Sequence, residues 1–407
     1  MLLKLAYRNI FRNFRRTLFT LMALSVAIMV LIVFDSYLKG LDTKTYEKLI
    51  DYETSHLKIF PLGYKADIDN LPIENAFTPE AIMAQLRADP DVKNVTVRIN
   101  FRVTLSNGID QLPVVGIAVD PAADENVFTM KQSVSDGEYL EGTDEAMVIG
   151  ADLAKDFNAR VGDTLTAQTR TRYSTYQALD LRIKGIIKSD DTAIDINSII
   201  IPLGLAQKSL DLGGGVTEID IRLKDPGKIE IFKDKYKDKL KGCEIWTWKE
   251  VAEDVMAHSR SHQMSKNIIF FCIVIIALIG ISNTILLSAF ERTREIGMLA
   301  AMGMKRGQIV GLFVLEGTMI GAAGSLIGCL IGLLLVIFWT TRSGFDISFA
   351  MRSFGNVGFR TGKFLGAWNI DLIPVAFIFG VIVSALSSIY PAFVASRMEP
   401  TEALRKY

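Results

Sequence analysis

Residues whose types could support chemistry occur at a few places in this sequence. His258 and His262 stand four residues apart in a predicted helix, which is a spacing that zinc ligands use. The glutamate of the metalloprotease arrangement is missing between them and no third ligand is evident, so we favour polar positions on an exposed helix. Asp190 and Asp191 could be imagined as a general acid and base, but adjacent acids in a loop are typical of a solvated turn.

The triple glycine Gly213–Gly215 is the candidate for a phosphate-binding loop. No lysine follows at the offset that such loops require, and the next residues have the pattern of a strand, so we favour a turn. Gly227-Lys228 and Gly362-Lys363 lack the earlier glycine and the following Ser or Thr of a Walker A sequence. We therefore predict no catalytic residue, no metal and no cofactor on this chain, and we do not expect it to be an enzyme.

A charged segment, residues 291–308, separates two long apolar stretches. A short charged helix between two membrane spans cannot be buried in lipid, so its exposed face must meet water or a second protein. We therefore predict that this segment is a docking element. It combines four charged residues, an apolar run at helical spacing and two glycines beside two cations: Glu291, Arg292, Arg294, Glu295, then Ile296, Leu299 and Ala300, then Gly303, Lys305, Arg306 and Gly307.

Composition excludes one class of partner. Half of the 407 residues are hydrophobic and the formal net charge is zero, whereas a nucleic-acid-binding protein needs a basic excess. Of the three cysteines, Cys272 and Cys329 lie in apolar stretches, so Cys243 has no partner in the polar part of the chain. The fold therefore cannot depend on disulfides.

Residues 1–16 contain several basic residues and no acid. Lys4, Arg8 and Arg12 recur every four residues while apolar residues follow a helical stripe, so a helix here would be basic on one face and apolar on the other. We predict an amphipathic helix on the cytoplasmic membrane surface. The alternative is the n-region of a signal peptide, but no small-x-small cleavage motif follows the apolar stretch.

Four stretches are long and apolar enough to be transmembrane helices of about 20 residues each: residues 17–36, 266–290, 309–340 and 372–396. Basic residues precede the first stretch and Asp35 lies at its end, so the positive-inside rule places residues 1–16 in the cytoplasm. With an even number of spans, the tail at residues 397–407 is also cytoplasmic, and the loop at residues 341–371 lies outside.

Residues 37–265 have the composition of a soluble domain inserted between the first and second spans. We predict a large mixed α+β extracytoplasmic domain of two subdomains, with helical stalks at Tyr37–Tyr52 and Lys249–Ser265. Alternating β-branched segments predict strands at His56–Phe60, Val92–Leu105, Pro113–Val119, Thr164–Thr169, Leu181–Lys188, Ser198–Ile201 and Glu218–Leu223. Helices are predicted at Pro79–Ala88, Ala151–Asn158 and Gly227–Leu240.

Small and polar residues inside the spans predict how the helices pack. Glu316 is costly if it faces lipid, so it should be paired, face the protein interior or lie near the headgroups; a proton relay would need titratable partners that are not visible. Ser282, Asn283 and Thr284 should bond to another helix or to their own backbone. Two stripes allow a neighbouring helix to approach closely: Gly317, Gly321 and Ser325, and Gly324, Gly328 and Gly332.

Three motifs, in this order along the chain, resemble the FtsX-domain permeases of ABC transporters, the group of the MacB-type exporters and the LolC/LolE-type lipoprotein-releasing subunits. They are LAYRNIFRNFRRT at Leu5–Thr17, ERTREIGMLAAMGMKRGQI at Glu291–Ile309 followed by VLEG at Val314–Gly317, and YPAFVASRMEPTEALR at Tyr390–Arg405. The segment EAMVIGADLAKDFNARVGDTLT at Glu145–Thr166 is similar to one common in the MacB-type periplasmic core of this family.

The resemblance implies a fold, a place in the cell and a set of partners. The chain would be a multi-pass protein of the bacterial inner membrane, with its large domain in the periplasm and both termini in the cytoplasm. A separate cytoplasmic ABC ATPase dimer would bind ATP and Mg and push on a coupling helix at residues 291–308. The contact residues would be Glu291, Arg292, Arg294, Glu295, Ile296, Leu299, Gly303, Lys305 and Arg306.

The same resemblance suggests mechanotransmission, in which the stalks carry ATP-driven motion to the periplasmic domain, and pairing with a second permease subunit. For the cargo we favour lipoproteins released toward a periplasmic carrier, because the motif at Leu5–Thr17, the sequence SHLKIFPLGY at Ser55–Tyr64 and the expected separate ATPase look more like the lipoprotein-releasing subunits. Efflux of a drug, peptide or toxin is the main alternative. A membrane-anchored periplasmic enzyme or sensor is the alternative of another class, and it would not need the segment at 291–308.

Overall fold

The computed structural model describes residues 2–12, 14–189, 191–240, 242–341, 345–346, 363–364 and 366–397. The chain forms two compact units. The sheet unit consists mainly of residues Lys44–Ala257, and the helical unit consists of the residues before and after it. Residues 398–407, most of the expected cytoplasmic tail, and most of the expected loop at 341–371 lie outside the described residues.

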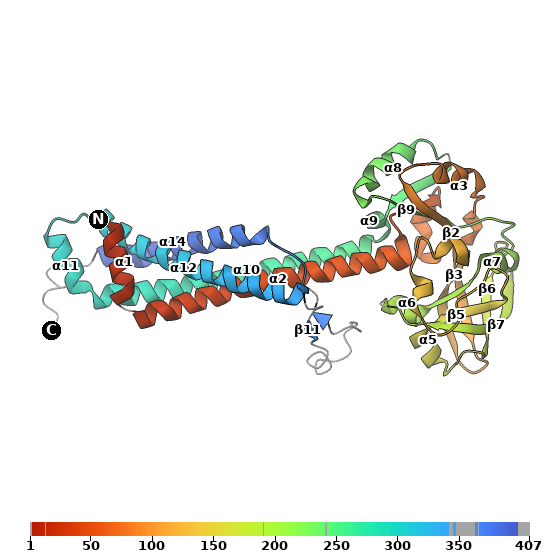
Figure 1. Cartoon of the computed structure of the whole chain (residues 1–407), viewed down its shortest axis with the longest axis horizontal. Coiled ribbons are helices and arrows are strands. Elements are labelled where there is room, and N and C mark those ends of the chain that lie inside the picture. Colours follow the sequence, from red (N-terminus) through yellow and green to blue (C-terminus); the bar gives the residue numbers. More distant parts are fainter. Residues whose placement is uncertain are drawn as a thin grey trace. The chain divides into compact units, whose positions relative to one another are not determined.

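Long helices make up the helical unit (Figure 1). Apart from the pair of short strands β11 (Phe345–Asp346) and β12 (Lys363–Phe364), its elements are α1 (Leu2–Arg12), α2 (Phe14–Leu49), α10 (Glu253–Glu291), α11 (Thr293–Ala301), α12 (Arg306–Thr341) and α14 (Leu372–Ser396). The boundaries between the two units fall inside α2 and α10. Each of these two helices therefore contributes residues to both units without a break.

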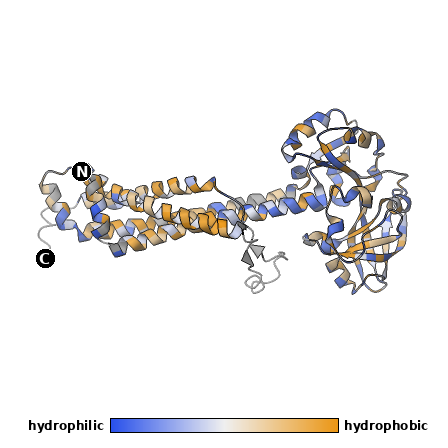
Figure 2. Ribbon diagram, in the orientation of Figure 1, coloured by the Kyte–Doolittle hydropathy of each residue, from blue (hydrophilic) through white to orange (hydrophobic). Residues whose placement is uncertain are grey.

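Within the described residues, four helices are long and apolar enough to cross a membrane, which confirms the predicted number of spans: Thr17–Thr54, Lys266–Glu291, Arg306–Thr340 and Leu372–Ser396. Figure 2 shows the hydrophobic residues concentrated along these helices. Helix α12 packs along α14 over most of its length, and buried apolar side chains of α2, α12 and α14 form one cluster around Ile28 and Cys329. The helical unit is thus held together by side-chain packing between its helices.

One end of the first span carries a buried polar cluster. The side chain of Asp35 is only 3% exposed and pairs with Lys266 of α10, with 2.7 Å between Oδ1 and Nζ. The Asn369 amide donates to Asp35 Oδ2 at 3.2 Å and to the carbonyl of Ile32 at 2.8 Å. Because a buried carboxylate without partners is costly, this cluster fixes α2, α10 and the segment before α14 against one another.

The sheet unit is built on one hydrogen-bonded sheet of ten strands, in the order β10-β1-β9-β2-β3-β8-β5-β7-β4, with β6 pairing with both β2 and β7. Its strands are β1 (Leu57–Pro61), β2 (Val92–Ser106), β3 (Gln111–Val119), β4 (Val134–Gly137), β5 (Ala146–Gly150), β6 (Thr164–Arg170), β7 (Tyr176–Ile187), β8 (Ser198–Pro202), β9 (Glu218–Leu223) and β10 (Cys243–Thr247). Its helices are α3 (Glu80–Arg87), α4 (Pro121–Asp124), α5 (Ala151–Asp156), α6 (Thr192–Asn197), α7 (Leu203–Ser209), α8 (Ile229–Lys237) and α9 (Trp248–Val251).

The mixed α+β character of this unit and the positions of all seven predicted strands are confirmed, with β9 beginning and ending at the predicted residues. The three strands β4, β5 and β10 were not among these seven. Buried side chains form two apolar clusters, a larger one that includes Ile99 and Ile219 and a smaller one that includes Phe128 and Ile200. Apolar side chains of the strands and helices therefore pack together in two clusters on the sheet.

Both helical connections to the sheet unit depart from a regular α-helix near the sheet. The α-helical hydrogen bonding of α2 ends at Leu49 and passes into a π-helical turn, η1 (Ile50–Thr54). The expected second stalk, Lys249–Ser265, is not one continuous helix, because Ala252 separates α9 from α10. The rings of Tyr46 in α2 and Trp248 in α9 lie 5.1 Å apart. Aromatic packing therefore joins the two connections at this point.

Candidate coupling site

The predicted docking segment forms a helix followed by a tight turn. Helix α11 (Thr293–Ala301) begins directly after α10, and Gly303 has a φ of 94° before α12 begins at Arg306. A positive φ is the conformation that glycine adopts at the end of a helix without steric strain. A Cβ atom at Gly303 would meet no atom within 4 Å, so its requirement for glycine comes from the backbone alone.

One side of α11 is packed into the helical unit. Ile296 is 6% exposed and lies in a cluster with apolar residues of α10, α12 and α14, among them Ile285, Phe313 and Ala392. Motion of α11 must therefore displace the ends of three membrane-length helices. The side chain of Leu299 lies outside what the structure describes.

The opposite side of α11 and the turn after it present an exposed strip, which we call the coupling strip. Its described members are Glu291, Arg294, Met298, Met302, Lys305 and Arg306. Met298 and Met302 are 49% and 76% exposed. Arg294, Met298 and Met302 follow one another at intervals of four residues, and this spacing could have identified the methionines in the sequence, because residues four apart share one helix face. Thioethers adapt to a partner surface, so the strip combines charge with deformable apolar contact.

Arg292 lies on the packed side and not in the coupling strip. It is 7% exposed, and its Nη1 atom lies 3.1 Å and 3.4 Å from the two carboxylate oxygens of Glu316 in α12. The amide of Asn9 in α1 donates to Glu316 Oε1 at 2.5 Å. Of the environments expected for Glu316, the structure shows a paired side chain that is buried in the protein. The sequence identified the charge of Arg292 but not the side of the helix on which it lies.

Glu295 extends this cluster to Arg12, the last residue of α1. Its Oε1 atom accepts from Arg12 at 2.7 Å, and its Oε2 atom lies 3.4 Å from Arg292 Nε. Partial burial opposes ionisation of Glu295, but the hydrogen bond and charge of Arg12, with the charge of Arg292, give a net lowering of its pKa. The carboxylate therefore stays ionised at neutral pH. We call Asn9, Arg12, Arg292, Glu295 and Glu316 the polar clamp.

The two small-residue stripes of α12 face two different helices. A Cβ atom on Gly317 or Gly321 would lie 1.7 Å from the Ser388 hydroxyl or 2.3 Å from the Cβ of Ser384, both in α14. The second stripe faces α2: its members Gly324, Gly328 and Gly332 approach Leu24, Ser25 and Ile28, and Ile32, respectively. Ser25 also donates to the carbonyl of Gly324 at 2.9 Å. Helix α12 is thus in close contact with α14 and α2 within one chain.

Hydroxyls in the second span bond to neighbouring helices, as predicted. Ser282 donates to the carbonyl of Ser387 in α14 at 2.7 Å, and the hydroxyls of Thr284 and Thr20 lie 2.9 Å apart. Asn283 is exposed at the surface of the chain. The first two contacts hold α10 against α14 and α2.

Comparison with known proteins identifies the family. A model of the FtsX-like permease C-terminal domain matches residues 267–400, which contain the coupling strip and most of the polar clamp. A model of the MacB-like periplasmic core domain matches residues 17–239, more than half of the chain. The chain is an FtsX-like ABC permease with a MacB-like periplasmic core domain.

Three relatives show how far the similarity of the permease extends. An uncharacterized ABC transporter permease of Methanocaldococcus jannaschii is 24% identical over 98% of this chain and 96% of that protein. The lipoprotein-releasing system transmembrane protein LolE of Haemophilus influenzae is 22% identical over 96% of this chain and 94% of that protein. The macrolide export ATP-binding/permease protein MacB of Campylobacter jejuni is 21% identical over 99% of this chain but only 61% of that protein.

The other candidate sites of the permease have structural explanations or lie outside the described residues. Gly213 and Gly214 have positive φ angles in a turn between α7 and β9, which confirms the predicted turn. Asp191 caps α6 by accepting from the Ala193 amide at 2.8 Å, and Asp190 is outside the described residues. His258 and His262 belong to α10, but the structure does not describe their side chains. Among the described residues, no group of three or more His, Cys, Asp or Glu side chains could hold a metal ion.

Proposed function

We propose that this permease is the membrane subunit of an ABC transporter and that a cytoplasmic ATPase dimer, which holds ATP and Mg, docks on its coupling strip. The observation that carries the proposal is the division of α11 into two sides. Ile296 and Arg292 are buried in the helical unit, while Arg294, Met298 and Met302 remain exposed. A helix held on one side and presenting cations and methionines on the other is suited to receive a protein partner.

The polar clamp supports a mechanism of mechanotransmission, in which force applied to α11 passes to the neighbouring helices. It links α11 to α12 through Arg292 and Glu316, and to α1 through Arg12 and Glu295. Because α11 cannot move without these partners, displacement by an ATPase would move α1 and α12 as well. Helices α2 and α10 each continue into the sheet unit, and they are the elements that we propose to carry the movement onward.

For the cargo we propose lipoproteins, released from the inner membrane toward a periplasmic carrier, with a second permease subunit completing the transporter. The match to LolE supports this, because it covers 96% of this chain and 94% of that protein. Efflux of a drug, peptide or toxin is the second candidate, because the match to MacB spans nearly all of this chain. Both assignments place the sheet unit in the periplasm and both termini in the cytoplasm.

Docking can be tested by reversing charge in the coupling strip. We expect Arg294→Glu to reduce co-purification of the ATPase at least about tenfold, since one interfacial charge pair contributes on the order of 1.5–7 kcal/mol. The measurement is the yield of ATPase, identified by its nucleotide-binding sequence and its ATP hydrolysis, recovered with the full-length chain from its native membranes. Arg87→Glu, at the exposed end of α3, is the matched control. Equal recovery with Arg294→Glu would place the docking surface elsewhere.

The cargo assignment has its own experiment. In proteoliposomes that contain the permease with its co-purified ATPase, we expect ATP to release a fluorescent triacylated lipoprotein to the soluble fraction only when the carrier is present. A macrolide and an unacylated form of the same protein serve as alternative cargoes. ATP-dependent movement of the macrolide without lipoprotein release would favour the second candidate.

A further inference from the structure

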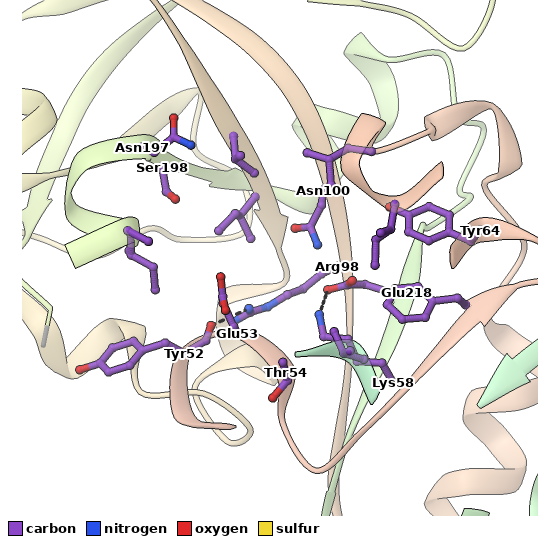
Figure 3. A pocket seen from close by; sticks show the side chains of 18 residues that line it. Tyr52, Glu53, Thr54, Lys58, Tyr64, Arg98, Asn100, Asn197, Ser198 and Glu218 are labelled. Carbon is purple, nitrogen blue, oxygen red and sulfur yellow. Dashed lines mark hydrogen bonds and ion pairs between the residues drawn. The ribbon is translucent and has the colours of Figure 1, made fainter. Parts of the chain in front are cut away.

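The sheet unit contains a cavity of about 310 Å³ that the transport mechanism does not use. It lies over the strands β1, β2, β3, β8 and β9, and it is covered by η1, by α6 and by the turn η2 (Tyr64–Asn70) (Figure 3). One part of its wall is apolar and includes Phe60, Ile117 and Ile194. A volume of this size can hold a small organic molecule.

Both cationic side chains that line the cavity are already neutralised. Lys58 Nζ lies 2.6 Å from Glu218 Oε1 and 3.3 Å from Asp220 Oδ1. The guanidinium of Arg98 donates to both carboxylate oxygens of Asp124, at 2.8 Å and 3.0 Å. Neither cation is left to attract an anionic ligand.

Arg98 makes one further hydrogen bond and a ring contact. Its Nη1 atom donates to the carbonyl of Tyr52 at 3.1 Å (Figure 3), and its guanidinium lies 3.3 Å from the centre of the Phe128 ring. The carboxylates of Glu218 and Asp124 thus balance the positive charges of Lys58 and Arg98. The paired groups therefore give the cavity no excess of positive charge.

Glu53 adds a carboxylate that has no partner. Figure 3 shows its side chain facing the cavity, and it makes no hydrogen bond or ion pair with any described residue. The Glu53 side chain is exposed to the cavity, but crowding by the surrounding protein and the negative charges of Asp191 and Glu218 raise its pKa, while the positive charges of Lys58 and Arg98 oppose this rise. A positively charged ligand would favour the ionised form of Glu53, which the surrounding protein and the neighbouring carboxylates disfavour.

A second polar group in the wall lacks a partner. Tyr64 is 1% exposed, and its hydroxyl has no hydrogen-bond partner among the described residues. The neighbouring hydroxyl of Thr217 is engaged with the backbone, where it accepts from the Asn100 amide and donates to the Arg98 carbonyl. A buried polar atom without a partner is unfavourable, and a ligand could supply one.

We propose that this cavity binds a small organic cation, whose ammonium group pairs with Glu53 and whose carbon chain lies against the apolar wall. An anion would meet the unpaired carboxylate and find no free cation. A divalent metal ion would find no group of three ligating side chains among the described residues. The paired charges of Lys58 and Glu218 hold the floor of the site in place.

The site adjoins both chain connections of the sheet unit. Glu53 belongs to η1, which follows α2, and Val251 lines the cavity at the end of α9, just before α10. A bound ligand would therefore contact residues that continue into α2 and α10. This inference does not depend on the cargo or on docking of an ATPase.

Isothermal titration of the full-length permease in detergent with putrescine tests the proposal. We expect saturable binding with a Kd of about 1 mM or tighter, which is reasonable for so small a ligand. Glu53→Gln should weaken binding about tenfold to a hundredfold, because a hydrogen bond to a charged group is lost while the shape of the side chain is kept. Glu230→Gln, at an exposed position of α8, should bind as the unaltered protein does.

Three outcomes would overturn the proposal. They are absence of putrescine binding to the unaltered protein, equal affinity in Glu53→Gln, and equal affinity for the neutral analogue 1,4-butanediol. Competition by Mg²⁺ that depends on Glu53 would replace the organic cation with a metal ion and would also overturn it. Near-ultraviolet circular dichroism of Glu53→Gln shows whether the variant keeps its tertiary packing.

Discussion

Replacing Arg292 with alanine is expected to destabilise the helical unit by about 3–5 kcal/mol, the penalty for leaving one member of a buried ion pair alone. The side chains of Arg292 and Glu316 are each 8% exposed, so water cannot compensate for the missing guanidinium. Asn9 would remain as a hydrogen-bond donor to Glu316, but it carries no charge. The measurement is the midpoint of thermal or denaturant unfolding of the full-length protein in detergent, together with the ATPase activity of the assembled transporter.

The control for Arg292→Ala is Arg294→Ala, two residues further along the chain in α11 but exposed. It should change stability by less than about 0.5 kcal/mol, as exposed substitutions usually do. The double variant Arg292→Met, Glu316→Met should recover much of the stability lost in the single variant, because apolar residues of similar size can replace a buried pair. If Arg292→Ala were as stable as Arg294→Ala, the polar clamp would not hold α11 in place.

The polar clamp also separates two effects that a docking helix can have on transport. If the ATPase docks on the coupling strip as proposed, variants of Arg294 or Met302 should remove contacts with it and leave the fold of the helical unit unchanged. Variants of Arg292 or Glu316 leave the coupling strip intact but loosen its attachment to α12. If docking and transmission are distinct, the first group should lose binding of the ATPase, and the second should keep binding but hydrolyse ATP without transport.

Much of the helical unit could be predicted because the membrane imposes simple local rules. A helix that crosses lipid must satisfy its backbone internally and be apolar over about 20 residues, so its length and composition are visible in the sequence. The glycines of α12 were visible for the same reason, since small residues four apart mark a close helix contact. Which helix each stripe meets could not be predicted, because Gly317 and Gly324 differ only in the direction that they face.

The sheet unit shows where local patterns fail. The alternation of apolar and charged residues in Glu218–Leu223 correctly predicts a strand, and it also implies that the charged residues face water. Instead Glu218 and Asp220 are 1% and 0% exposed, because β9 lies between β1 and β2 and Lys58 on β1 lies against both carboxylates. Burial raises the pKa of Asp220 to about 8 although Lys58 opposes the shift. Contacts between strands so distant in sequence cannot be read from either segment alone.

Gly321→Val in α12 is the second change with a large expected effect. A Cβ atom there would lie 2.3 Å from the Cβ and 2.4 Å from the hydroxyl oxygen of Ser384, and 3.4 Å from the Gly380 carbonyl. Ser384 belongs to α14 and is fully buried, so α12 and α14 would have to separate. We expect a loss of stability of about 3 kcal/mol or more, at the upper end of the range for overpacking, measured as a fall in the unfolding midpoint in detergent.

The matched control for Gly321→Val is Gly311→Val, because both glycines lie in α12 and a Cβ atom at Gly311 would meet no atom within 4 Å. The same residue is introduced into the same helix, so differences in helix propensity cancel. Gly311→Val should therefore stay within about 1 kcal/mol of the unaltered protein. The pair Gly321→Val, Ser384→Gly should regain part of the lost stability by making room on α14. Equal stability of the two single variants would mean that α12 and α14 are not in close contact at Gly321.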